Sequence, residues 1–174
     1  MKLYSLATLS LFLASSVSAG NLFQQGASLV EFITPTTNVG KQVPGESPLY
    51  FCGDSSDDVA TIEKVDLLPN PPIPGQTLEI EAVGTLHDAI TLGAVVHITV
   101  KYGLITLLKE SLDLCENAGQ VDLECPVNKG KLIIKKSVDI PKQIPPGQYT
   151  VIADAFTADD RHITCLTATI RFYS

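Results

Sequence analysis

The sequence predicts an all-β protein with an immunoglobulin-like β-sandwich of seven to eight strands. After residue 38, short segments rich in Val, Ile and Thr alternate with clusters of Gly, Pro, Asn and Asp. No convincing amphipathic helix pattern interrupts this series. Four cysteines lie near its start, middle and end. A row of short strands of this kind is typical of a two-sheet sandwich, although the chain lacks the Trp of antibody domains.

Eight segments have the composition and spacing of strands. Breakers such as Pro69 to Gly75 and Pro141 to Gly147 separate them. The expected strands are 49–52, 60–68, 77–86, 94–102, 105–114, 131–140, 148–157 and 163–173. The apolar stretch 89–108 is predicted to be two strands around Gly103 rather than a membrane span, because it is rich in β-branched residues.

Side-chain alternation predicts which face of several strands points inward, because successive strand residues point to opposite faces. In the segment 94–102, one face carries Val96, Ile98 and Val100. The apolar residues predicted to face inward in two other strands are Leu78, Ile80, Ala82, Gly84 and Leu86, and then Leu132, Ile134, Val138 and Ile140.

The cysteine placement favours two disulfides, Cys52–Cys165 and Cys115–Cys125, among the three pairings that four cysteines allow. The first would join the two ends of the domain, and the second would close a short loop. On the chain-entropy model they would stabilise the fold by about 4.8 and about 2.8 kcal/mol.

The first nineteen residues have the features of a signal peptide: Lys2, an apolar run and small residues ending at Ala19. The run is shorter than the roughly 20 residues that span a bilayer. We therefore expect an exported protein, secreted or held in a vacuolar or lysosomal lumen, where disulfides persist. Residues 20–37 are either a pro-segment with its linker or an extra packed element, and the domain is expected over 38–174.

The formal net charge of −7 argues against nucleic acid as a partner, because phosphate binding needs clustered cations. The charge is uneven, since residues 126–147 contain five Lys and one Asp. This stretch is either a solvated strand face or an anchor for anionic lipid headgroups.

No known catalytic motif is present, and neither a cofactor nor a metal site is expected. His87, His97 and His162 are far apart in sequence and are interpreted as structural. Asp154 lies in an apolar strand and is the one carboxylate whose surroundings could be functional, although an outward-facing strand carboxylate is the simpler interpretation. We therefore expect a protein that is not an enzyme.

Several short motifs in order resemble the ML domain family. They are Phe51-Cys52-Gly53, the run 94–97 (Ala-Val-Val-His), Cys115 with Cys125-Pro126, and the segment 145–149 before Cys165. The resemblance covers residues 51–172 and is greatest to the fungal phosphatidylglycerol/phosphatidylinositol transfer branch. The chain differs from the animal Niemann-Pick type C sterol carrier, because the stretch 69–74 contains no cysteine that could form the third disulfide of that carrier.

The resemblance implies a sandwich that encloses one lipid in an apolar cavity and transfers phospholipid between membranes. Leu107 and Ile144 would lie at the rim. The other expected lipid contacts are Val96, Ile98, Val100, Ile105, Ile134 and Val138, and the expected headgroup contacts are Lys129, Lys131 and Lys142. It also implies that residues 20–37 are a pro-segment.

Two alternatives stay open: sterol binding and transport, and a solidly packed extracellular immunoglobulin-like module without a small ligand. If the protein is a lipid carrier, we expect a monomer that contacts membrane surfaces transiently.

Overall fold

The computed structural model describes residues 40–173. The expected signal peptide 1–19 and pro-segment 20–37 lie outside this described part. The elements are β1 (Leu49–Phe51), β2 (Ala60–Leu68), β3 (Thr77–Leu86), β4 (Val95–Tyr102), β5 (Ile105–Asp113), α1 (Leu114–Asn117), the 3-10 helix η1 (Ala118–Val121), β6 (Gly130–Asp139), β7 (Gly147–Phe156) and β8 (His162–Phe172).

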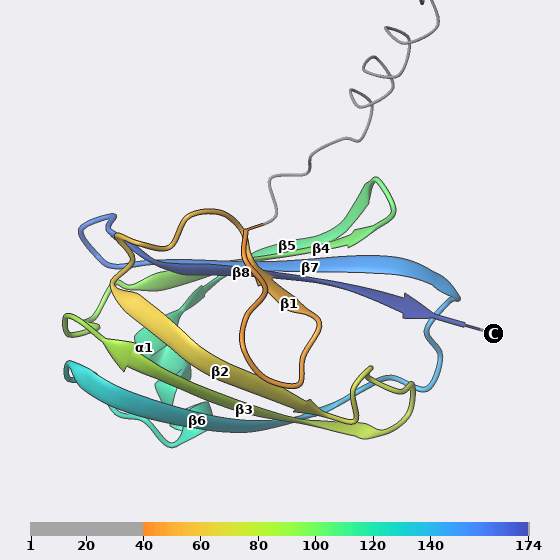
Figure 1. Ribbon diagram of the computed structural model, residues 1–174, viewed down its shortest axis with the longest axis horizontal. Helices are drawn as coiled ribbons and strands as arrows, with labels where there is room; N and C mark the ends of the chain where they lie inside the picture. The colour runs from red at the N-terminus through yellow and green to blue at the C-terminus, as the bar shows by residue number, and fades with distance from the viewer. Residues whose placement is uncertain (1–39, 174) are drawn as a thin grey trace, which may run out of the picture. The chain divides into compact units, whose positions relative to one another are not determined.

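The strands form two antiparallel sheets that face each other (Figure 1). One sheet has five strands in the order β1-β8-β7-β4-β5, and the other has three in the order β2-β3-β6. The predicted immunoglobulin-like sandwich is therefore confirmed. All eight expected strands are present, and each end lies within one residue of its expected position.

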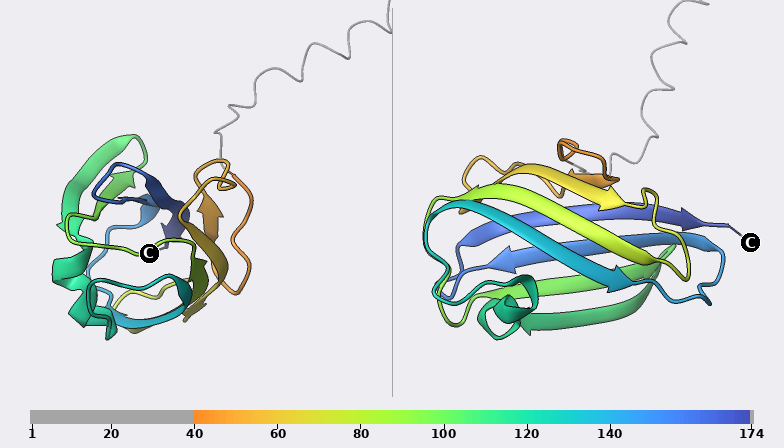
Figure 2. Two further views of the ribbon diagram at one scale, coloured as in Figure 1. Left: turned by 90° about the vertical axis from the view of Figure 1, so that its left-hand side faces the viewer. Right: turned by 90° about the horizontal axis from the view of Figure 1, so that it is seen from below.

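The sequence pattern did not predict α1 and η1, which lie inside the loop closed by Cys115 and Cys125. Asp113 ends β5 and caps α1, because its Oδ1 accepts hydrogen bonds from the backbone N–H groups of Cys115 (2.8 Å) and Glu116 (2.9 Å). Figure 2 shows these short helices between the edge strands β5 and β6 of the two sheets.

The strand register agrees with the predicted inner faces. In the β4–β7 pair, Val96 lies opposite Ala155, which is buried in the core. Directly opposite residues in an antiparallel pair point to the same face. Val96 and the alternate residues Ile98 and Val100 therefore point towards the other sheet.

The interior between the sheets contains few completely buried large side chains. Among the described residues, Val43 is the largest side chain with less than 2% of its surface exposed. Buried side chains form two separate clusters, one around Ala94 and Ile163 and another around Phe51 and Val65. A solidly packed sandwich core would bury larger aliphatic and aromatic residues. This sandwich is therefore incompletely filled.

Two disulfides connect the pairs expected from the sequence. Cys52 and Cys165 have their Cα atoms 5.4 Å apart and are 113 residues apart in sequence. Cys115 and Cys125 have a Cα separation of 5.5 Å and are 10 residues apart. The first bridge joins the segment after β1 to β8, and the second closes the loop that carries α1 and η1.

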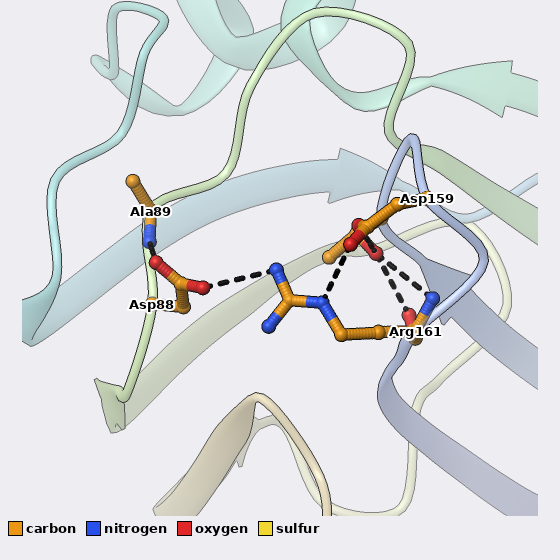
Figure 3. A network of polar contacts seen from close by, with 5 residues as sticks. Asp88, Ala89, Asp159 and Arg161 are labelled. Atoms are coloured by element: carbon orange, nitrogen blue, oxygen red, sulfur yellow. Dashed lines mark hydrogen bonds and ion pairs between the residues drawn. The ribbon is translucent and has the colours of Figure 1, made fainter.

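A polar network connects the loop after β3 to the turn between β7 and β8 (Figure 3). Arg161 Nη2 donates to Asp88 at 2.9 Å, and Arg161 Nε donates to Asp159 at 2.9 Å. Hydrogen bonds from the Ala89 N–H and from Arg161 hold the pKa of Asp88 below its ordinary value. The Thr157 hydroxyl and Arg161 do the same for the pKa of Asp159.

The lowered aspartate pKa values predict an acid-dependent effect of Arg161→Met. Because these carboxylates stay ionised more easily in the folded state, their contribution to stability is present above the ordinary pKa of 3.8 and disappears as they take up protons at lower pH. The variant should therefore be less stable than the parent at pH 7, and the difference should shrink below pH 3.8.

Urea unfolding at several pH values measures this difference. The matched control is Arg171→Met, because the Arg171 side chain is hydrogen-bonded to the neutral Gln148. A stability difference for Arg161→Met that stayed constant from pH 7 to pH 3 would contradict the prediction.

Candidate functional site

A cavity of about 420 Å³ lies between the two sheets, beside α1 and η1. This volume is within the range of roughly 300–1,000 Å³ that is typical of pockets for small molecules. Its walls come from β2, β3 and β6 of one sheet, from β5, β7 and β8 of the other, and from the α1–η1 loop. Apolar side chains from these elements include Ala60, Ile62, Leu112, Leu114, Ala118, Val121, Leu132 and Ile134.

Four of the nineteen lining residues are polar: Asn117, Gln120, Lys136 and Thr164. Lys136 Nζ donates hydrogen bonds to Gln120 Oε1 at 3.0 Å and to the Gln120 carbonyl oxygen at 3.3 Å. Gln120 is exposed and Lys136 is half-buried, so this part of the lining reaches solvent. The cavity thus combines a largely apolar interior with polar residues on the part that reaches solvent, among them the cation Lys136.

A second depression, of about 450 Å³, lies along the three-stranded sheet, and most of its lining is charged or polar. The lining residues are Asp66, Leu68, Glu79, Ile80, Glu81, Lys135, Lys136 and Ser137, so Lys136 borders both this depression and the cavity between the sheets. Charged walls of this kind cannot remove an apolar molecule from water. The cavity between the sheets, although slightly smaller, is therefore the better candidate for a functional site.

The structure brings only part of the predicted apolar site to this cavity. Ile134 lines it, and Val96 packs against the core cluster beside it. Ile98 and Val100 share the inner face of β4 but are not among the lining residues. Val138 lies further along β6 and is 38% exposed.

The two predicted rim residues, Leu107 and Ile144, lie away from the cavity lining. Leu107 is 57% exposed in β5, near the β4–β5 turn, and Ile105 beside that turn is 63% exposed. Ile144 is half-buried in the loop before β7, which Tyr102 Oη anchors by a 3.0 Å hydrogen bond to the Pro146 carbonyl. These residues belong to the end of β4 opposite the α1–η1 end.

The three lysines predicted to contact a headgroup are all exposed and do not line the cavity. Lys131 forms an ion pair with Glu63 at 3.3 Å on the outer face of the three-stranded sheet. Lys129 precedes β6, and Lys142 lies in the loop after it.

Sequence reasoning missed Lys136, although strict alternation carries the signal. Leu132 and Ile134 were assigned to the inner face. Lys136 is the next residue that alternation places on that face of β6. The α1–η1 part of the wall was also missed, because its fold depends on the disulfide and on the Asp113 cap rather than on an amphipathic pattern.

A separate polar group surrounds His162. Its Nδ1 is 2.5 Å from Asp58 Oδ1, and its Nε2 is 3.1 Å from Asp154 Oδ1. Because carboxylates engage both ring nitrogens, neither nitrogen is left to activate a nucleophile. His162 therefore connects the segment before β2 to β7, as a structural residue does.

Among residues 40–173, no group of three or more His, Cys, Asp or Glu residues is arranged to hold a metal ion. No helix within the same residues is long and apolar enough to cross a membrane.

Comparisons with known sequences find close relatives. A protein named phosphatidylglycerol/phosphatidylinositol transfer protein from Neurospora crassa is 57% identical over 133 residues, which is 75% of each chain. Proteins of the same name are 53% identical in Aspergillus oryzae, covering 78% of this chain and 77% of theirs, and 46% identical in Emericella nidulans, covering 97% of both.

Solved structures with this fold are more distant in sequence. Chicken MD-1 complexed with lipid IVa has a TM-score of 0.53 at 23% identity, covering 76% of this chain and 96% of its own. A Niemann-Pick type C2 protein from the Japanese carpenter ant has a TM-score of 0.55 at 13% identity, covering 71% and 98%. The family model described as the ML domain matches residues 46–172, and the chain therefore belongs to the ML domain family.

Proposed function

We propose that the protein binds a single phospholipid, such as phosphatidylglycerol or phosphatidylinositol, in the cavity between its sheets and transfers it between membranes. The observation that carries this proposal is the cavity itself, which is apolar inside and polar at its mouth. The relatives named as transfer proteins support the choice of ligand. The activity is binding and release, without chemical change of the lipid.

The energetics favour an enclosed lipid. Exposing each methylene group to water costs about 0.8 kcal/mol, so a bare two-chain lipid faces a barrier on the order of 20 kcal/mol. An empty apolar cavity is itself unfavourable by roughly 24 cal/mol per Å³. For about 420 Å³ this gives an upper limit on the order of 10 kcal/mol, comparable to the whole stability of a domain. An apolar ligand relieves both costs.

Native mass spectrometry of gently purified protein tests the proposal. The expected result is an adduct with the mass of one phospholipid per monomer, and reloading stripped protein from vesicles should restore it. A sterol adduct would favour sterol transport instead. If no lipid bound even after reloading, the chain would be a binding module without a small ligand.

The turn between β4 and β5 is the part that we propose to contact membranes. Its apolar side chains are unusually exposed: Leu104 100%, Ile105 63%, Leu107 57% and Leu108 45%. A contiguous exposed apolar patch marks an interaction surface. Figure 1 shows this hairpin bending away from the rest of its sheet. These leucines can enter the interfacial region of a bilayer during lipid exchange.

Replacing Leu104 and Leu107 with Glu should weaken association with phosphatidylglycerol vesicles by roughly tenfold or more per leucine, since burying one leucine contributes about 1.5–3 kcal/mol. Vesicle co-sedimentation measures the change. Leu92→Glu is the matched control, because Leu92 is also exposed, at 77%, but precedes β4 rather than following it. Equal vesicle binding by the double variant and the parent would exclude this hairpin as the contact.

Export through the secretory pathway, to the outside or to a vacuolar or lysosomal lumen, completes the proposal. The two disulfides support it, since such bonds persist in oxidising compartments. We propose a monomer, because the cavity is lined within one chain.

A further inference from the structure

We propose that Lys136 binds the phosphate group of the lipid at the cavity mouth and makes the protein select anionic phospholipids over lipids that lack a phosphate. This inference rests on the proposed function and assigns the polar end of the ligand to one side chain. The chemistry recognised is a phosphate diester oxygen next to acyl chains.

The position of Lys136 in the sheet is unusual for a lysine. In the β3–β6 pair it lies opposite Ile80, on the same face as Ile134, which lines the cavity opposite Ala82. Its neighbour Lys135 lies opposite Glu81 on the other face of the sheet. Lys136 is thus the lysine of β6 whose register directs it between the sheets.

The other two lysines of β6 form ion pairs with glutamates, whereas Lys136 does not within residues 40–173. Lys131 pairs with Glu63 at 3.3 Å, and Lys135 pairs with Glu81 at 3.0 Å. Within residues 40–173, Lys136 makes no ion pair, and its hydrogen-bond partner is the neutral Gln120. A half-buried cation without a carboxylate beside it favours an anionic ligand, because attraction between opposite charges strengthens away from bulk water.

The hydrogen bonds of Lys136 also leave room for a ligand. An ammonium group has three N–H donors, and Gln120 accepts two of them through its carbonyl and side-chain oxygens. Gln120 is held in turn, because its Nε2 donates to Asn117 Oδ1 at 2.8 Å. This arrangement leaves one Nζ donor without a partner among residues 40–173. A phosphate oxygen is a strong acceptor for it.

The apolar lining beside Nζ indicates that the phosphate belongs to a lipid rather than to a free ion. Ile134 and Val121 line the same cavity as Lys136. A lipid held with its acyl chains against such residues would place its phosphate at the polar edge, whereas free phosphate would gain nothing from them.

The test compares dioleoyl phosphatidylglycerol with dioleoylglycerol, which has the same acyl chains and no phosphate. Each lipid is offered to stripped protein in vesicles of digalactosyldiacylglycerol, a neutral bilayer lipid without phosphate, and bound lipid is quantified by native mass spectrometry. Lys136→Met should reduce uptake of the phosphatidylglycerol by about 10- to 100-fold, the effect of losing a hydrogen bond to a charged group. Uptake of dioleoylglycerol should not change.

Lys135→Met is the matched control, since it removes the same charge from the adjacent residue on the outer face. It should leave both uptakes unchanged, and Lys136→Arg should retain selectivity. Lys136→Gln, a second uncharged variant, should reproduce the loss shown by Lys136→Met. Inorganic phosphate should not compete with the lipid.

Several outcomes would overturn the assignment. They are equal phosphatidylglycerol uptake by Lys136→Met and the parent, equal losses in Lys135→Met and Lys136→Met, or full competition by inorganic phosphate. Failure of the parent protein to take up either lipid would instead contradict the proposed function, so the two failures are distinguishable.

Discussion

Replacing Ile134 with Trp should strongly reduce phospholipid uptake while leaving a folded sandwich. Ile134 lines the cavity from the edge strand β6 and is half-buried. The larger indole would occupy space that an acyl chain needs, and its position on an edge strand lets it adjust without displacing the buried cluster around Ala94. We expect transfer between vesicles to fall by at least about tenfold, the effect of losing some 1.4 kcal/mol of ligand burial.

Ile133→Trp is the matched control for this experiment. Ile133 is the preceding residue of the same strand and is 54% exposed, so its side chain points away from the cavity. Its variant should transfer lipid at the rate of the parent. Circular dichroism should show β-sheet in both variants. Unimpaired transfer by a folded Ile134→Trp protein would mean that lipid does not occupy this cavity.

Removing the Cys52–Cys165 disulfide should lower the free energy of unfolding more than removing Cys115–Cys125. The long bridge spans 113 residues and the short one 10. A longer closed loop restricts the unfolded chain more, which gives expected losses of about 4.8 and about 2.8 kcal/mol for the two double Cys→Ala variants. The long bridge alone would thus contribute a large share of the roughly 5–15 kcal/mol typical of a domain.

Urea unfolding of lipid-free and lipid-loaded protein measures these losses. Because a bound ligand stabilises only the folded state, loaded protein should tolerate the loss of either bridge at higher urea concentration. Reduction of both bridges should lower the melting temperature more in lipid-free protein. A larger loss from the short bridge would contradict the loop-length argument, and equal melting shifts would contradict compensation for the cavity.

The strands were predictable because their signals are local. β-branched residues, alternation and Gly or Pro breakers placed all eight strands within one residue. Gly103 illustrates this: its φ of 56° at the β4–β5 turn is a conformation that glycine adopts without strain. Alternation likewise placed Val96 and Ile134 on inner faces, where the register confirms them.

The candidate site was predictable only in part, because it depends on which ends of the strands meet. Rim positions at Leu107 and Ile144 were expected from family resemblance, but the cavity lies at the other end of β4, beside α1. The folded 115–125 loop forms that wall, and no periodic pattern in the sequence predicts how this loop folds. Whether those two residues contact lipid stays a prediction.

The sequence by itself determined the class of the molecule: a β-sandwich with four cysteines and the motifs of the ML domain family. The alternation of side chains in strands and the residues of turns depend on only a few consecutive positions, so both can be recognised in the sequence alone. Only the tertiary structure decided where the sandwich is hollow and which lysine faces that hollow. Those properties depend on the register of β6 against β3 and on the packing of α1 and η1 between two sheet edges. Lys135 and Lys136 are adjacent in the sequence but lie on opposite faces of the sheet, because side chains of successive strand residues point in opposite directions.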